Sequence, residues 1–80
     1  MKKINYTKHA REKLKERNID KTNIKETIEY PDRSLDNING TKIVHKIYDK
    51  KLLRVIYRDE ENHYLVITAY YTKKERYEVK

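Results

Sequence analysis

The stretch NGTKIVHKIYDKKLLRVIYRDEENHYLVITAYY, residues 39–71, decides the fold class. It contains three runs rich in Ile, Val, Leu and Tyr, separated by short polar segments, a pattern typical of β-strands joined by turns. Asn39-Gly40 is a strong hairpin signal, because a type I′ turn needs positive φ at both central positions. The pattern therefore predicts strands over residues 34–38, 41–48, 52–58 and 64–71.

The residues before this stretch carry helix signals. Thr7 is a good N-cap for a first helix that ends near Arg17. Asp20 is a good N-cap for a second helix over residues 21–29, and Pro31 ends it because the residue before a proline avoids the α region. The first helix has a narrow apolar stripe that consists of Tyr6, Ala10 and Leu14, spaced four residues apart.

The length and the apolar content of the chain allow one core. We therefore expect a single domain over residues 1–80. Its fold class is α+β, with two N-terminal helices packed on one face of a twisted sheet of three to four antiparallel strands.

The register of the strands predicts two different sheet faces. We place Tyr48 opposite Leu52 across a turn at 49–51, and Arg58 opposite Tyr64. One face is then nearly apolar and is expected to lie under the helices: Ile43, His45, Ile47, Leu53, Val55, Tyr57, Leu65, Ile67, Ala69 and Tyr71. The other face gathers cations and tyrosines around a few apolar residues: Lys42, Val44, Lys46, Tyr48, Leu52, Arg54, Ile56, Arg58, Tyr64, Val66, Thr68 and Tyr70. Its apolar members indicate that a partner, a substrate or the C-terminal tail covers part of it.

The composition favours a negatively charged partner. The formal charge is +7, from 20 Lys and Arg against 13 Asp and Glu, which suits a polyanion, although solubility alone would also explain a charge of several units. There is no Cys, so disulfides and thiolate metal sites are excluded and a reducing, cytoplasmic compartment is expected. No apolar run approaches the length of a membrane span, and the N-terminus lacks a signal-peptide pattern. The histidines have no metal-motif spacing, so we expect neither a metal nor a cofactor.

Several segments together resemble a prokaryotic domain family of unknown function that is placed in the RelE/ParE toxin superfamily. The likeness covers nearly the whole chain and is carried by His9-Ala10-Arg11, Leu14, Arg17-Asn18-Ile19-Asp20, Pro31, Leu53-Arg54-Val55-Ile56-Tyr57, Val66-Ile67-Thr68-Ala69-Tyr70 and Lys73-Lys74-Glu75-Arg76-Tyr77. The resemblance implies the two-helix, antiparallel-sheet fold of metal-independent microbial ribonucleases. It also implies a toxin that cleaves messenger RNA, often on the ribosome, and that a small antitoxin protein neutralises. The antitoxin is expected to be acidic.

The resemblance marks the site residues His9, Arg17, Arg54, Thr68, Tyr70 and Tyr77, with Lys42 and Lys46 as counterparts of a lysine-rich strand. Metal-free cleavage needs a base for the 2′-OH, a cation for the phosphorane and an acid for the leaving oxygen. Arg54 is the expected cation, and His9 the base or the acid. Thr68 would contact phosphate or orient His9, and Tyr70 would stack on a base or donate a proton. The expected RNA-binding residues are Arg17, Lys42, Lys46, Arg58 and Tyr77.

Each of these residues also has a structural explanation. His9 could serve a helix terminus, Thr68 and Tyr70 are common on exposed strands, and Arg17 suits a helix C-terminus. We expect His45 to be a buried core histidine and His63 to lie in a turn. Two other functions therefore stay open: a non-catalytic module that binds RNA or an acidic protein, and a ParE-like inhibitor of DNA gyrase.

Overall fold

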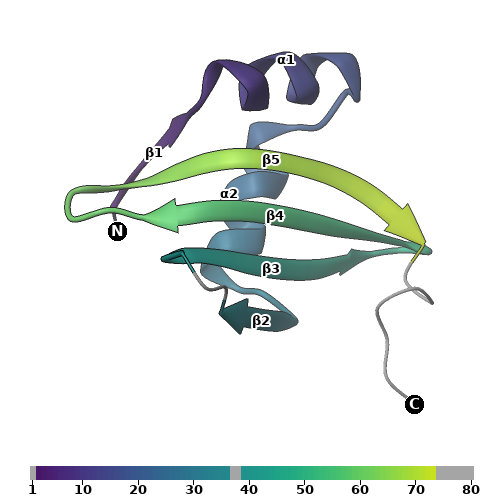
Figure 1. Cartoon of the computed structure of the whole chain (residues 1–80). Helices are drawn as coiled ribbons and strands as arrows, with labels where there is room; N and C mark the ends of the chain where they lie inside the picture. The colour runs from purple at the N-terminus through teal and green to yellow at the C-terminus, as the bar shows by residue number, and fades with distance from the viewer. Residues whose placement is uncertain (1, 37–38, 74–80) are drawn as a thin grey trace.

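A computed structural model describes residues 2–36 and 39–73 of the chain. Two helices cover one face of a five-stranded sheet, and the other face is not covered by either helix (Figure 1). We call the latter the open face. The elements in chain order are β1 (Lys3–Tyr6), α1 (Lys8–Glu16), α2 (Lys21–Glu29), β2 (Arg33–Asp36), β3 (Thr41–Tyr48), β4 (Lys51–Asp59) and β5 (His63–Lys73). Among the described residues, no helix is long and apolar enough to cross a membrane.

Both helices begin where the sequence predicts. Oγ1 of Thr7 accepts the backbone N–H of Ala10, and a carboxylate oxygen of Asp20 accepts that of Thr22, which satisfies donors that the first helical turn leaves open. Asn18 ends the turn after α1 in a left-handed conformation (φ 55°) that Asn tolerates better than most residues. The helix assignments are therefore confirmed.

The sheet has one strand more than predicted and is mixed rather than antiparallel. Its order is β1-β5-β4-β3-β2, and β1 runs parallel to β5 while all other neighbours are antiparallel. The four residues of β1 are too few to show a clear alternation in the sequence. They pair with His63–Val66 of the last strand, a long-range contact that a local pattern does not predict.

The turn between β3 and β4 is shorter than predicted, and this reverses every assignment made for β3. Tyr48 pairs with Lys51, not with Leu52, because Asp49 takes a left-handed conformation (φ 58°) and closes a two-residue turn. A shift of one residue moves all side chains of a strand to the opposite face. Val44 thus lies under the helices and His45 on the open face. The predicted faces of Lys42, Lys46, Tyr48, Ile43 and Ile47 were likewise wrong.

A β-bulge divides β5 into two halves with different register. Ile56 pairs with Thr68, whereas the next residue, Tyr57, pairs with Val66, so that Ile67 is the extra residue. Beyond the bulge, Thr68 and Tyr70 share the open face with Arg54, as predicted. Before the bulge the prediction was wrong, because Tyr64 and Val66 face the helices and Leu65 faces the other way.

The core lies between the sheet and the helices. α1 packs along β5, while α2 crosses behind β4 and β3 (Figure 1). The buried cluster consists of Ala10, Leu14, Ile19, Ile24, Ile28, Val44, Leu53, Val55, Tyr57, Val66 and Ala69. A polar contact adds to it: the hydroxyl of Tyr48 donates to Oε1 of Glu26 at 2.9 Å and so ties β3 to α2. Burial, together with the nearby Glu26 carboxylate, raises the pKa of Tyr48 to about 12.

Candidate nucleic-acid interface

One row of side chains crosses the open face of the sheet at right angles to the strands. Arg33 of β2 pairs with His45 of β3, His45 with Arg54 of β4, and Arg54 with Tyr70 of β5. The guanidinium of Arg17, at the end of α1, lies over the ring of Tyr70, with 5.8 Å from its central carbon to the ring centroid. We call these five residues the basic row. Five different elements thus bring three arginines, one histidine and one tyrosine together.

Arg54 and His45 are in direct contact within the basic row. Nη1 of Arg54 lies 2.9 Å from Nε2 of His45. An arginine side chain has only donors and stays charged, so Nε2 must be the acceptor and the proton of a neutral imidazole must be on Nδ1. The contact therefore fixes both the direction of the guanidinium and the tautomer of the histidine.

The surroundings of His45 keep it uncharged. Burial lowers the pKa of His45 below its usual 6.5, and the charges of Arg54 and Arg33 lower it further. The side chain is only 2% exposed, so the loss of hydration is a sufficient physical cause. A neutral partner orients Arg54 without cancelling its positive charge, which a carboxylate partner would do.

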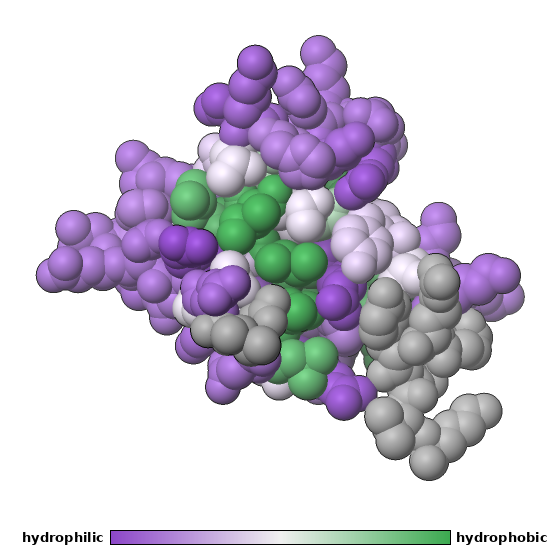
Figure 2. Space-filling model, in the orientation of Figure 1, coloured by the Kyte–Doolittle hydropathy of each residue, from purple (hydrophilic) through white to green (hydrophobic). Residues whose placement is uncertain are grey.

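Apolar residues flank the basic row on both sides. Leu35, Ile43 and Ile56 form the next row across β2, β3 and β4, and Thr68 completes that row on β5. On the other side of the basic row lie Ile47 and Leu52. Figure 2 shows apolar side chains gathered in the middle of this face, with polar ones around them. Such an arrangement presents charge and apolar surface together, which suits a ligand with phosphates and flat bases.

Beyond the residues that pair with β1, the outer edge of β5 is joined by hydrogen bonds to Thr7 and Arg17, at the two ends of α1. Nη1 of Arg17 donates to the backbone oxygen of Ala69 at 2.9 Å, and Oγ1 of Thr7 donates to that of Ile67 at 3.3 Å. Arg17 therefore has a structural role as well as its position over Tyr70. Because one guanidinium carries five N–H donors, the bond to Ala69 leaves most of them for other contacts.

Besides Arg17, four of the predicted site residues lie on or beside the open face. Arg54 and Tyr70 are direct cross-strand partners, and Thr68 is one pair further along β5. Arg58 is on the same face, four residues from Arg54 along β4, with its Nε 3.9 Å from a carboxylate oxygen of Glu60. This distance along the strand is about 13 Å, so Arg58 extends the face and is not part of the basic row.

Lys42 and Lys46 do not lie on this face, so their predicted placement was wrong, while their role in RNA binding stays a prediction. The shorter turn after β3 places both on the side of the helices. Nζ of Lys46 donates to the backbone oxygen of Tyr30 at 2.9 Å, just after α2. Nζ of Lys42 lies 3.7 Å from a carboxylate oxygen of Asp59. Both lysines are accounted for by contacts within the fold.

His9 and Tyr77 are not among the residues that the basic row brings together. His9 is exposed on the first turn of α1, two residues after the Thr7 cap that contacts β5. Tyr77 lies outside the described residues. In the part of the chain that the structure describes, no group of three or more His, Asp or Glu side chains is placed to hold a metal ion.

Two members of the basic row, His45 and Arg33, were not predicted from the sequence. His45 was expected in the core, and its burial is confirmed while its face was wrong. The only signal was the length of the turn at 49–50, since a two-residue turn would have placed His45 beside Arg54. Arg33 begins β2, where a four-residue strand gives too short a pattern to fix its register.

Comparison with known proteins gives a family but no function. The model of a domain family described as a domain of unknown function, DUF4258, matches residues 6–71. The chain belongs to the DUF4258 family. The match includes Arg17, Arg33, His45, Arg54 and Tyr70, so the whole basic row lies inside the DUF4258 domain. It says nothing of the RelE/ParE superfamily, and that placement stays a prediction. No curated protein and no solved structure matched the chain.

Proposed function

We propose that this DUF4258 domain binds single-stranded RNA on its open face and cleaves it without a metal, as the toxin-like component of a toxin–antitoxin pair. One observation carries the proposal: Arg54 is held in place by a neutral histidine in the middle of a row of cations. A guanidinium fixed in position by a neutral partner is a group suited to phosphate binding and phosphorane stabilisation.

The other members of the basic row have complementary roles. Arg17 and Arg33 would contact neighbouring phosphates on either side of Arg54. Tyr70 offers a ring for stacking and a hydroxyl that can donate a proton to the leaving oxygen. The apolar row of Leu35, Ile43 and Ile56 would contact the bases. None of these residues is assigned as the general base. The candidate for that role is His9, which the sequence predicts to be the base or the acid.

The direct test is incubation of the purified full chain with labelled messenger RNA in the presence of a metal chelator. We expect discrete cleavage products, and we expect Arg54→Ala to abolish them while the circular-dichroism spectrum is unchanged. Expression of the wild-type chain alone should arrest bacterial growth, and Arg54→Ala should relieve the arrest. Wild-type levels of products from Arg54→Ala would rule out this mechanism.

The second candidate is a module that binds RNA without cleaving it. Its support is the burial of His45, which leaves no exposed histidine directly beside Arg54. Salt-dependent RNA binding with no products after long incubation would decide for this function. The ParE-like alternative predicts inhibition of DNA gyrase instead, and a supercoiling assay with the same preparation separates it from both.

A further inference from the structure

A second positively charged site lies on the other side of the sheet, between β1 and the start of α2. It is a hollow of about 530 Å³. Its walls are formed by Lys2, Lys3, Ile4 and Tyr6 from the N-terminal segment and by Lys21, Thr22 and Lys25 from α2. Ile4 and Tyr6 pack against the core under the helices, so this hollow is separate from the basic row and independent of the function proposed above.

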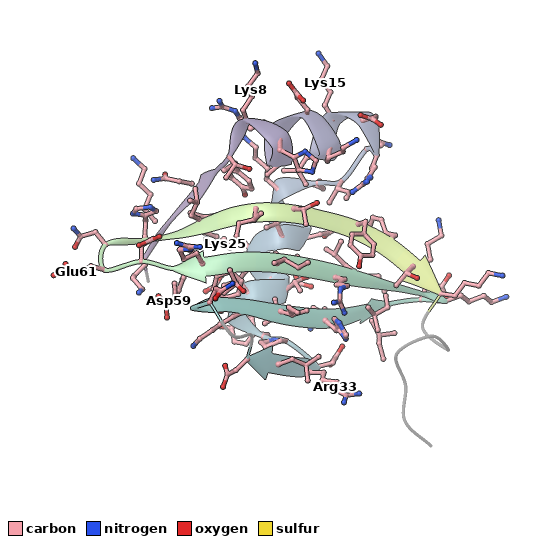
Figure 3. All side chains as sticks on the ribbon, viewed as in Figure 1. Lys8, Lys15, Lys25, Arg33, Asp59 and Glu61 are labelled. Atoms are coloured by element: carbon pink, nitrogen blue, oxygen red, sulfur yellow. The ribbon has the colours of Figure 1, made fainter. Side chains whose placement is uncertain are left out.

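Positive charge accumulates around the hollow. Four of its seven lining residues are lysines, and none is acidic. Lys21 and Lys25 are one turn apart on α2, a spacing at which like charges repel. The first turn of α2 contains no acidic residue, and the carboxylate of the N-cap Asp20 is bonded to the helix N-terminus. Figure 3 shows Lys25 extending from α2 toward the end of the sheet where β4 ends.

Acidic groups near the hollow balance only part of this charge. Nζ of Lys2 bonds to a carboxylate oxygen of Asp59 and, at 2.7 Å, to the backbone oxygen of Glu60. The carboxylate of Asp20 accepts the backbone N–H of Thr22. Lys3, Lys21 and Lys25 have no ion pair with any other residue that the structure describes.

The hollow also has an apolar wall with an aromatic ring. Tyr6 and Ile4 form it, and Nζ of Lys21 lies 4.9 Å from the centroid of the Tyr6 ring. Burial raises the pKa of Tyr6, so its hydroxyl stays neutral and adds no negative charge. An aromatic ring beside several ammonium groups matches a ligand that has both a flat apolar part and a phosphate.

We propose that this hollow binds a nucleoside phosphate. Its phosphate lies among Lys21, Lys25 and the lysines before β1, and its base lies against Tyr6 and Ile4. The volume falls within the range of small-ligand sites. The ligand is either a free nucleotide or one nucleotide of an RNA strand, since both have the same chemistry.

The test is a titration of the ¹⁵N-labelled full chain, followed by NMR, with three probes: ADP, inorganic pyrophosphate and a 2′-O-methyl RNA hexamer. We expect ADP to shift the backbone amides of Ile4, Tyr6 and Thr22. We expect the double variant Lys21→Gln/Lys25→Gln to raise the Kd for ADP roughly tenfold. Its matched control is Lys8→Gln/Lys50→Gln, which loses the same charge from exposed positions that do not line the hollow.

Each outcome bears on the proposal. Equal effects of the two double variants on ADP binding would overturn it. Pyrophosphate binding as tightly as ADP would also overturn it, because the base would then contribute nothing.

The hexamer identifies the source of the nucleotide. If the hexamer binds more tightly than ADP, and if the slope of its log affinity against log salt falls by about 1.4 in the Lys21/Lys25 variant, the ligand is RNA, since each phosphate contact contributes about 0.7. If ADP binds at least as tightly, the ligand is a free nucleotide. Arg54→Ala should leave ADP binding unchanged, which separates this site from the open face.

Discussion

Nη1 of Arg54 donates a hydrogen bond of 2.9 Å to Nε2 of His45, its partner on the neighbouring strand. The imidazole is neutral, because burial and two nearby guanidinium groups lower its pKa. The pair thus differs from an arginine–carboxylate pair in one physical respect: the histidine does not neutralise the guanidinium. A charge held in one position is what an RNA phosphate would meet on the open face.

The first prediction concerns the charge of the partner of Arg54. His45→Gln retains an acceptor near the place of Nε2, so we expect RNA affinity within about threefold of the wild type. His45→Glu supplies a carboxylate that neutralises the guanidinium, and we expect RNA affinity to fall by at least tenfold. Fluorescence anisotropy with a 2′-O-methyl RNA hexamer measures both.

A thermal unfolding curve for each variant is the control, because a buried carboxylate can also destabilise the sheet. The RNA affinities are compared only under conditions in which both variants are more than 95% folded. Equal affinities of the folded Gln and Glu variants would show that the charge of Arg54 is not used for binding.

The second prediction concerns the geometry of Arg54. A guanidinium contacts phosphate through two parallel N–H groups, whereas an ammonium is a point charge. We therefore expect Arg54→Lys to keep the net charge of the protein and still lose most of the RNA affinity. Arg58→Lys, on the same face but outside the basic row, should have little effect. If the two substitutions weaken RNA binding equally, the affinity depends on the overall positive charge of the open face and not on the geometry of the Arg54 guanidinium.

The third prediction concerns stability in mild acid. Because the pKa of His45 is lowered in the folded state, the unfolded chain binds a proton near pH 6.5 that the folded chain refuses until a lower pH. The contribution of the neutral His45 to the free energy of unfolding is therefore fully present above about pH 6.5. It decreases as the pH falls below this value, with a slope of at most about 1.4 kcal/mol per pH unit for one proton.

Urea unfolding at pH 7.5, 6.5 and 5.5 measures this slope. His45→Gln should flatten it, while the exposed His9→Gln should not. The pKa of Asp59 is lowered chiefly by its hydrogen bond from Lys2, and this carboxylate titrates below the range tested. An unchanged slope in His45→Gln would place the acid-sensitive group elsewhere.

The fourth prediction tests the face of β3. Lys42 and Lys46 lie on the side of the helices, so Lys42→Gln/Lys46→Gln should weaken RNA binding no more than Lys8→Gln/Lys50→Gln does. Loss of the Lys46 contact to Tyr30 and of the Lys42–Asp59 ion pair should lower the free energy of unfolding by about 1 kcal/mol in total. A much larger loss of RNA affinity than in the control would show that these lysines serve the interface.

Much of the fold follows from local signals in the sequence. Thr7, Asp20 and Pro31 act on their own neighbours, and the helices they delimit are where the sequence places them. The pairing of β2 with β3 follows the Asn39-Gly40 signal, and Gly40 has a positive φ (73°). The predicted two-residue turn was wrong in its register, because Asp36 pairs with Lys42, whereas a turn of two residues at 39–40 would pair it with Ile43. Arg54, Thr68 and Tyr70 share one face, as expected, because burying an unpaired arginine would cost several kcal/mol.

The remaining differences come from single-residue events that a regular pattern does not contain. A turn with two residues instead of three moved His45 to the open face, and one bulged residue, Ile67, changed the face of Tyr64 and Val66. The strand β1 depends on a parallel contact with the far end of the chain. For this reason the sequence predicted Arg54 but not its histidine partner.

The most direct test of the account is an NMR map of RNA binding on the ¹⁵N-labelled full chain, using a 2′-O-methyl RNA hexamer that is not cleaved. The account predicts that the amides of Arg33, His45, Arg54 and Tyr70 shift together during the titration and that Arg54→Ala removes these shifts. Saturable binding that leaves all four amides unshifted would contradict the assignment of the open face as the RNA-binding surface.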